Sequence, residues 1–177
     1  LNEVIDLFES YDANATFFTT GSHCECIAQE DVLRLNSSKH EIANHNMYDH
    51  PYINFTQNEF SVDLDTTNQI LDKLSFNVSK WYRAPFGRIN DAMVSELDKR
   101  GLIHVVSDAF ANDTEIPDAK WIAKYILNRV GDGSIVLIHM PEKGFREWNL
   151  EAMELTLKGL RKKNYKILTL TELDNLE

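Results

Sequence analysis

Short apolar runs alternate along this chain with stretches in which apolar residues recur every three or four positions. The first pattern is typical of buried strands and the second of amphipathic helices. The clearest helix is predicted at residues 60–74, whose apolar positions step by four, three, four and three. Residues 135–138 are almost continuously apolar, as expected for a strand that is buried on both faces.

The whole pattern predicts an α/β protein with parallel strands and crossover helices. Strands are expected at residues 15–18, 41–43, 80–82, 103–106, 135–138 and 166–170. Helices are expected at residues 1–11, 32–35, 60–74, 90–97, 121–130 and 150–160. A length of 177 residues predicts a single domain, residues 1–177.

Composition narrows the possible partners. The formal net charge is −10, and the chain has one short basic cluster, at residues 161–163. Duplex nucleic acid and anionic membranes both require clustered Lys and Arg, so neither is expected as a partner. No apolar run approaches the roughly 18 residues of a transmembrane helix. Cys24 and Cys26 are too close together for a zinc half-site with a two-residue spacer, and their pairing stays open.

Five Asn-x-Ser/Thr triplets are the only sign of cellular location. They begin at Asn14, Asn36, Asn54, Asn77 and Asn112. Such triplets are acceptors for N-glycosylation, and their number favours a secreted or extracellular glycoprotein. No signal peptide is visible, because Leu1 opens directly into a helical pattern.

A first group of reactive side chains follows the strand at residues 41–43. His45, Asp49 and His50 come within six residues of each other and precede Pro51. Imidazole and carboxylate groups on a rigid turn suit a divalent metal. The alternative is a polar loop whose histidines bond to backbone, and the metal interpretation is preferred.

Two further motifs lie where later strands should end. Arg83 opens the turn Arg-Ala-Pro-Phe-Gly, and its guanidinium could hold a carboxylate or form a surface ion pair. His139 ends the apolar strand, where it could act as a general acid or be a core histidine. Asp108 and Asp113 follow the strand at residues 103–106, and either could orient His139.

The order of these motifs resembles the polysaccharide deacetylase family, the NodB-homology domain of carbohydrate esterases. The resemblance rests on four motifs, Ala-Thr-Phe-Phe (15–18), His-Glu-Ile-Ala-Asn-His (40–45), Arg-Ala-Pro-Phe-Gly (83–87) and Leu-Ile-His (137–139). It implies a distorted (β/α) barrel and a hydrolase that removes acetyl groups from polymers of the chitin or N-acetylglucosamine type. A carbohydrate polymer would be the substrate, and a divalent metal, commonly zinc, the cofactor.

The resemblance also implies roles for single residues. The metal ligands would be His45 with either Asp49 or His50, because the family's His-x-x-x-His spacing places Asp49 at the second position. Among catalytic groups, Arg83 would brace a carboxylate, and His139 would be the general acid with Asp108 or Asp113 as its partner. The substrate would contact Pro85, Phe86 and Leu137.

One departure from the family pattern affects this expectation. The opening motif, a strand ending in Thr-Phe-Asp-Asp-Gly, is absent from the sequence. We therefore expect a barrel that lacks its first strand, either because the domain is N-terminally incomplete or because the chain is an inactive, carbohydrate-binding relative. A hydrolase of a non-sugar amide, or a scaffold without a ligand, would fit the same fold.

Overall fold

The computed structural model of the protein describes residues 1–176 and divides into two compact units. One unit is formed by residues 15–106 together with the chain from Thr169 onward. The other is formed by residues 1–14 and 107–168. The two units are called here the sheet unit and the helical unit, and each is described by itself.

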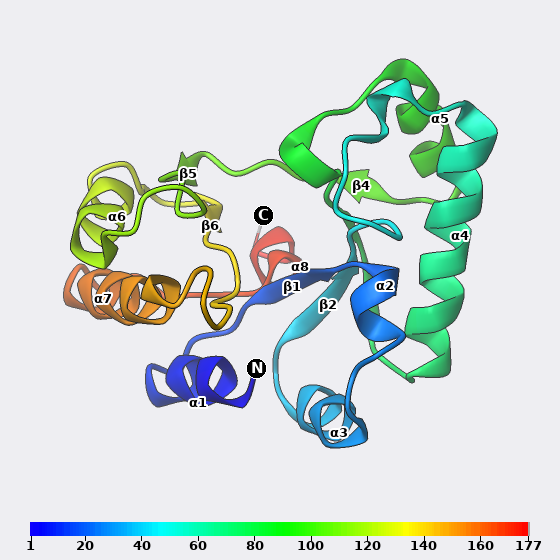
Figure 1. The fold of residues 1–177 in the computed structure, drawn as a ribbon. Helices are drawn as coiled ribbons and strands as arrows, with labels where there is room; N and C mark the ends of the chain where they lie inside the picture. Colours follow the sequence, from blue (N-terminus) through cyan, green and yellow to red (C-terminus); the bar gives the residue numbers. More distant parts are fainter. Residues whose placement is uncertain (177) are drawn as a thin grey trace. The chain divides into compact units, whose positions relative to one another are not determined.

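The sheet unit is built on four parallel strands that are neighbours in chain order (Figure 1). The strands are β1 (Thr16–Thr19), β2 (Glu41–Asn44), β3 (Val78–Tyr82) and β4 (Ile103–His104). The helices are α2 (Gly21–Cys24), α3 (Gln29–Ser37), α4 (Gln57–Lys73), α5 (Asp91–Lys99) and α8 (Leu170–Asp174), with 3₁₀ turns η1 (Tyr52–Asn54) and η2 (Pro85–Gly87). Sequential order without reversal is the strand order of a barrel rather than of a doubly wound sheet.

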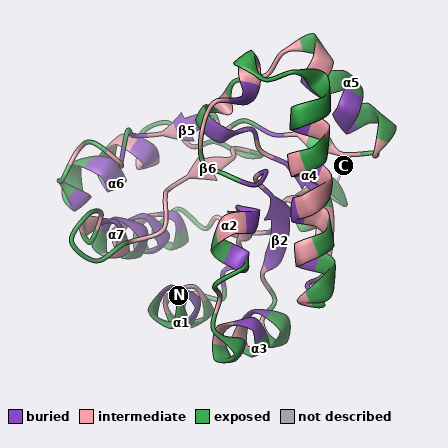
Figure 2. Cartoon of the chain, turned by 45° about the vertical axis from the view of Figure 1, so that its right-hand side comes forward, coloured by how far each residue is buried: buried purple, intermediate pink, exposed green. Residues whose placement is uncertain are grey.

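The core of the sheet unit explains the two strongest sequence patterns. All four residues of β2 are buried, and Figure 2 shows the strand buried along its length. Helix α4 buries the predicted face, including Phe60, Leu64 and Leu71. It begins with a capping box in which Thr56 and Glu59 satisfy each other's backbone N–H groups.

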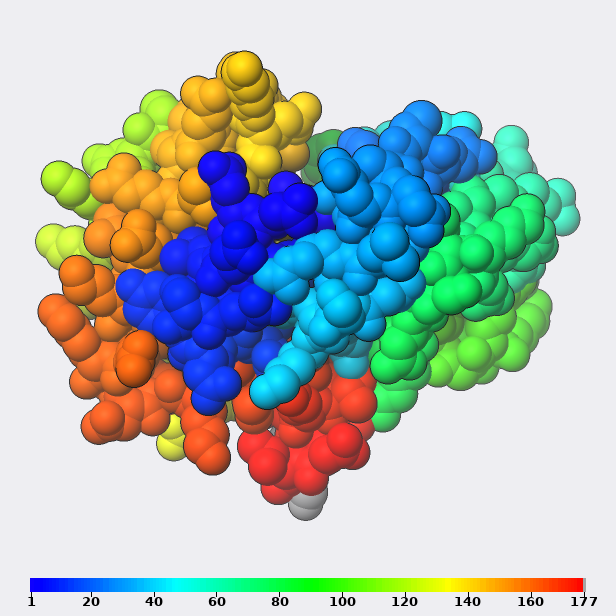
Figure 3. All heavy atoms as spheres, turned by 90° about the horizontal axis from the view of Figure 1, so that it is seen from below, coloured from blue at the N-terminus to red at the C-terminus, as the bar shows by residue number. Residues whose placement is uncertain are grey.

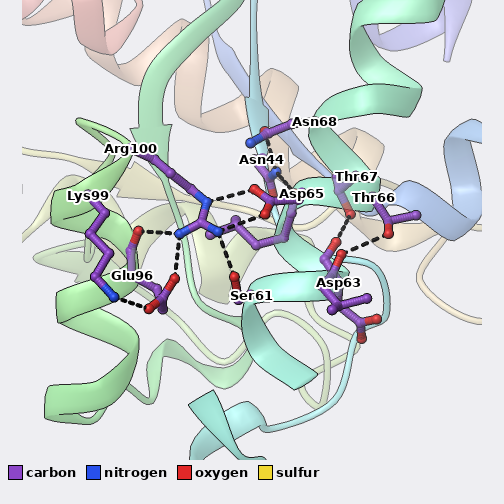
Figure 4. Close-up of polar contacts among 12 residues, drawn as sticks. Asn44, Ser61, Asp63, Asp65, Thr66, Thr67, Asn68, Glu96, Lys99 and Arg100 are labelled. Carbon is purple, nitrogen blue, oxygen red and sulfur yellow. Dashed lines mark hydrogen bonds and ion pairs between the residues drawn. The ribbon is translucent and has the colours of Figure 1, made fainter. Parts of the chain in front are cut away.

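A charged network joins α4 to α5 (Figure 4). Arg100 donates to both carboxylate oxygens of Asp65, at 2.6 and 2.7 Å, and to Glu96 Oε2 at 2.6 Å. Lys99 and Gln57 both donate to the other oxygen of Glu96. The bonds from Lys99, Arg100 and Gln57 hold the pKa of the Glu96 carboxyl well below its ordinary value.

The helical unit pairs two short parallel strands and packs two helices together. Its elements are α1 (Asn2–Ser10), β5 (Ala109–Phe110), α6 (Ala119–Leu127), β6 (Val136–Leu137) and α7 (Trp148–Lys162). Gly159 lets α7 approach α6, because a side chain there would collide with Leu127. Helix α1 lies against α7, and Figure 3 shows its atoms in contact with that part of the chain.

The structure confirms most predicted elements and corrects one. Each predicted helix is present, and five of the six predicted strands contain an observed strand. The strand predicted at residues 166–170 is wrong, since Leu170 begins α8 and Thr169 caps that helix through Glu172. The strand β5 and the helix α2 were not predicted from the sequence.

Two further observations bear on the sequence-based expectations. Among residues 1–176, no helix is long and apolar enough to span a membrane. Cys24 and Cys26 are both free thiols, Cys24 buried and Cys26 exposed. Burial raises the pKa of the Cys24 thiol.

Candidate active site

The loop that follows β2 orients His45. The His45 N–H donates to the carbonyl oxygen of Thr19, and its ring Nδ1 lies 2.6 Å from the carbonyl oxygen of Arg83. A carbonyl can only accept, so Nδ1 carries the hydrogen and the lone pair of the ring is on Nε2. Nε2 lies 3.9 Å from Oδ1 of Asp49, whose side chain is exposed. Two metal-ligand atoms of the predicted set therefore face each other.

Buried polar contacts hold this loop in place. The side chain of Asn44 donates to Asn68 at 2.7 Å and accepts from the backbone N–H of Asn46 at 2.6 Å, and Figure 4 shows the first of these bonds. The first N–H groups of α2, from Gly21 and Ser22, donate to the loop carbonyls of residues 46 and 47. Gly21 is required for this approach, because a Cβ would lie 2.6 Å from the sulfur of Met47.

His50 does not join the pair formed by His45 and Asp49. Its ring is stacked flat on Phe55 at a centroid distance of 4.9 Å, and it packs against Tyr52 at 4.5 Å and Tyr48 at 5.7 Å. In the described part of the chain, no three His, Cys, Asp or Glu side chains converge as metal ligands. The structure thus brings Asp49, rather than His50, next to His45.

The Arg83 motif forms the turn predicted for it. Pro85 is buried at the start of η2, while Phe86 and Gly87 both have positive φ angles, of 58° and 65°. The ring of Phe86 is 65% exposed, so it is available to a ligand. The guanidinium of Arg83 donates to the carbonyl oxygen of Val105, and burial lowers the pKa of this group. The backbone carbonyl oxygen of Arg83 fixes the ring of His45 through the bond to Nδ1.

The helical unit holds the second pair of reactive groups. His139 Nδ1 lies 2.9 Å from Oδ1 of Asp113, and the backbone N–H of His139 donates to Oδ2 at 2.7 Å. Asp113 is fully buried and also accepts from the side chain of Asn149 at 2.7 Å. The indole N–H of Trp148 donates to the carbonyl oxygen of Asp113. A buried carboxylate bonded in this way fixes the imidazole ring with Nε2 pointing away from it.

Asp108 has a different partner. Its carboxylate accepts from the backbone N–H of Ile135 at 2.6 Å and from the hydroxyl of Ser134 at 2.8 Å. These bonds tie the start of β6 to β5, which places Leu137 beside Phe110 in the parallel ladder. Of the two candidate partners of His139, the structure selects Asp113 and gives Asp108 a structural contact.

The sequence did not predict the role of three asparagines that support the site. Asn44 directly follows a predicted buried strand, and a polar residue at that position could have indicated a role in supporting the loop. Nothing in the sequence marks Asn149 as a partner of Asp113. Asn46 is fully buried with a φ of 62°, and neither atom of its amide has a hydrogen-bond partner among residues 1–176.

The residues of the β2 loop fit a divalent metal as part of a ligand set. His45 presents a fixed imidazole nitrogen and Asp49 a carboxylate oxygen, which are both common zinc ligands. Asn46 follows His45 in the chain, and its buried side-chain amide has no hydrogen-bond partner among residues 1–176. Buried polar groups ordinarily have a partner. Two protein ligands are fewer than the three of a typical catalytic zinc site.

Comparison with known proteins places this geometry in a family. The family model for polysaccharide deacetylase matches residues 1–105, more than half of the chain. The chain belongs to the polysaccharide deacetylase family. A peptidoglycan-N-acetylglucosamine deacetylase from Bacillus cereus is 30% identical over 97% of this chain and 80% of that protein. The peptidoglycan-N-acetylmuramic acid deacetylase PdaC from Bacillus subtilis is 25% identical over 99% of this chain.

Solved structures confirm the fold class. The structure of PdaC matches with a TM-score of 0.88, covering 99% of this chain and 83% of that one. A family 4 acetyl xylan esterase from Clostridium thermocellum, solved with a cobalt ion, is 27% identical with the same TM-score and coverage. A pseudoenzyme of the CE4 family from Bacillus anthracis, 20% identical with a TM-score of 0.88 over 97% of this chain and 59% of its own, shares the fold.

The chain accounts for only part of several relatives. It spans 36%, 52% and 61% of the lengths of three curated bacterial proteins that it matches.

Proposed function

We propose that this member of the polysaccharide deacetylase family is a metal-dependent hydrolase that removes N-acetyl groups from a polymer of the N-acetylglucosamine type. The observation that carries the proposal is that each unit contains one oriented pair of reactive groups. His45 faces Asp49 in the sheet unit, and His139 is bonded to buried Asp113 in the helical unit. Family membership supports a polysaccharide substrate and a hydrolytic reaction.

Metal binding is assigned to the β2 loop. His45 and Asp49 would hold a divalent ion, which we propose to be zinc, and the cobalt ion in a related esterase supports this chemistry. When bound, such an ion polarises a carbonyl group and lowers the pKa of water. The bond from His45 Nδ1 to the Arg83 carbonyl keeps the ring in the tautomer that a metal requires.

Proton transfer is assigned to His139. With Nδ1 held by Asp113, its Nε2 can carry a proton to the nitrogen that leaves when the amide bond breaks. Asp113 fixes the orientation of the His139 ring. Arg83 is proposed to hold a catalytic carboxylate ionised, and Pro85, Phe86 and Leu137 are each proposed to contact the substrate.

Dependence on a metal can be tested directly. The full-length protein should release acetate from an N-acetylglucosamine tetramer, a chelator should abolish the release, and added zinc or cobalt should restore it. A rate that the chelator leaves unchanged would contradict the metal assignment. Acetate release from the tetramer but not from a non-sugar acetamide would support the substrate class.

A catalytically inactive carbohydrate-binding relative is the second candidate. Two observations favour it: three metal ligands do not converge in the described residues, and the fold is shared with a pseudoenzyme. Binding of the tetramer without acetate release, in the presence of added zinc, would identify this function.

Secretion and glycosylation are proposed from the sequons. Asn36, Asn54, Asn77 and Asn112 are exposed, as acceptors must be, whereas Asn14 is half-buried. A mass decrease on treatment with a glycosidase, for protein purified from its natural source, would test this.

A further inference from the structure

An exposed aromatic ring stands beside the proposed metal ligands. Tyr48 precedes Asp49 in the chain and follows His45 by three residues. The residue is 48% exposed, although its neighbour Met47 is buried.

The backbone and ring of Tyr48 are held in place. Its N–H donates to the hydroxyl of Tyr52 at 3.1 Å, and Tyr52 is itself buried and donates to Asp63. One face of the Tyr48 ring packs on His50, with 25° between the ring planes, and His50 is stacked on Phe55 at 7°. The three rings form a row, called here the aromatic row, with Tyr48 at one end.

This arrangement leaves His50 with a packing role that metal binding would disturb. Its Nε2 is buried and has no hydrogen-bond partner among the described residues. His50 lies between the rings of Tyr48 and Phe55, and its contact restricts the Tyr48 ring to a narrow set of orientations. Little side-chain entropy of Tyr48 therefore remains to be lost when a ligand packs on its ring.

We infer that Tyr48, supported by the aromatic row, is a stacking surface for a pyranose ring of the polymer next to the ring that is deacetylated. The inference rests on the proposed function. Pyranose rings carry C–H groups on an apolar face, and an aromatic ring offers a flat, polarisable surface of similar size.

The inference makes Tyr48 a determinant of polymer affinity that touches no reacting atom. Substitution should therefore raise KM and leave kcat unchanged. Tyr48→Ala and Tyr48→Leu should each weaken binding of an N-acetylglucosamine tetramer by roughly three- to tenfold, the range expected for one aromatic stacking contact. Tyr48→Phe should keep the affinity, because the flat ring rather than the hydroxyl makes the contact.

The experiment is titration of the full-length protein with the tetramer by calorimetry, together with steady-state kinetics. Trp121→Ala is the matched control, since Trp121 is 41% exposed on α6 and far in sequence from the β2 loop. Thermal unfolding confirms that each variant is folded, and Tyr48→Leu keeps apolar bulk if the alanine variant is unstable.

The outcomes separate this inference from the function on which it rests. If the wild type binds the tetramer and both ring-deleting variants bind it equally well, the inference is overturned while the proposed function stands. If Trp121→Ala loses as much affinity as Tyr48→Ala, the effect is not specific and the inference is also overturned. If the wild type binds no oligomer, the proposed function fails and the inference fails with it.

Discussion

At the scale of single residues, the His139–Asp113 pair makes the sharpest prediction. Asp113→Asn removes the carboxylate that holds Nδ1 of His139 and fixes its ring, so turnover should fall by a factor on the order of 10² or more. Asp108→Asn is the matched control, because that carboxylate bonds Ser134 and Ile135 instead. Acetate release would be measured for both variants. Equal losses would show that Asp113 has no special part in the reaction.

Metal affinity separates the neighbours Asp49 and His50. Asp49 faces His45 Nε2, while His50 packs in the aromatic row, so Asp49→Ala should weaken zinc binding at least tenfold and His50→Ala should weaken it less. Competition with a chromogenic chelator would give both affinities. The reverse order would show that His50 moves to the metal.

Not all of these residue assignments could be predicted from the sequence. The motif order identified His45 and His139 as candidates, but Asp108 and Asp113 both follow the same predicted strand and no local sequence pattern separates them. Two contacts distinguish the aspartates. The N–H of Ile135 donates to Asp108, whereas Asn149, which lies on a helix 36 residues beyond Asp113, donates to Asp113. Contacts of that range are set by tertiary packing.

At the scale of elements, Gly21 controls the packing of α2 on the β2 loop. A Cβ there would lie 2.6 Å from Met47 Sδ and 2.8 Å from Thr67 Oγ1, so Gly21→Ala should destabilise the protein by about 1–3 kcal/mol. Gly131→Ala has open space around it and is the control. Urea unfolding of the two variants measures the difference. Equal free energies of unfolding would mean that α2 shifts without cost.

The network between α4 and α5 predicts a dependence of stability on pH. The folded state holds the pKa of Glu96 below its unfolded value, so the network's stabilisation is fully present above the unfolded pKa, about 4.3. It is lost as the pH falls from there towards the folded pKa. Glu96→Gln should therefore flatten the decline in thermal stability between about pH 5 and pH 3, whereas Glu154→Gln, on the exposed face of α7, should not. Parallel curves for all three proteins would contradict this.

Elements with strong periodicity or a distinct apolar run could be predicted, and those without either could not. The face of α4 and the buried strand β2 follow from patterns that burial alone imposes. The error at residues 166–170 came from reading an apolar run as a strand, although Thr169 and Glu172 form a capping box that marks a helix start. The two-residue strands β4 and β6 lie within apolar runs that predicted them, whereas β5 is too short to leave a signal.

At the scale of the whole molecule, the chain belongs to the polysaccharide deacetylase family and carries one oriented pair in each compact unit. Motif order made the family recognisable even where helix and strand boundaries were not. The sequence predicts a single domain, and this stays a prediction. The net charge of −10 weighs against nucleic acid as a partner.

The central claim is that the two pairs have separate tasks in one hydrolysis, metal binding at His45 and proton transfer at His139. The most direct test is the rate of acetate release from an N-acetylglucosamine tetramer by zinc-loaded, full-length His139→Ala. We predict a rate lower by a factor on the order of 10² to 10⁴, with the zinc content of the wild type retained. A wild-type rate in this variant would contradict the account.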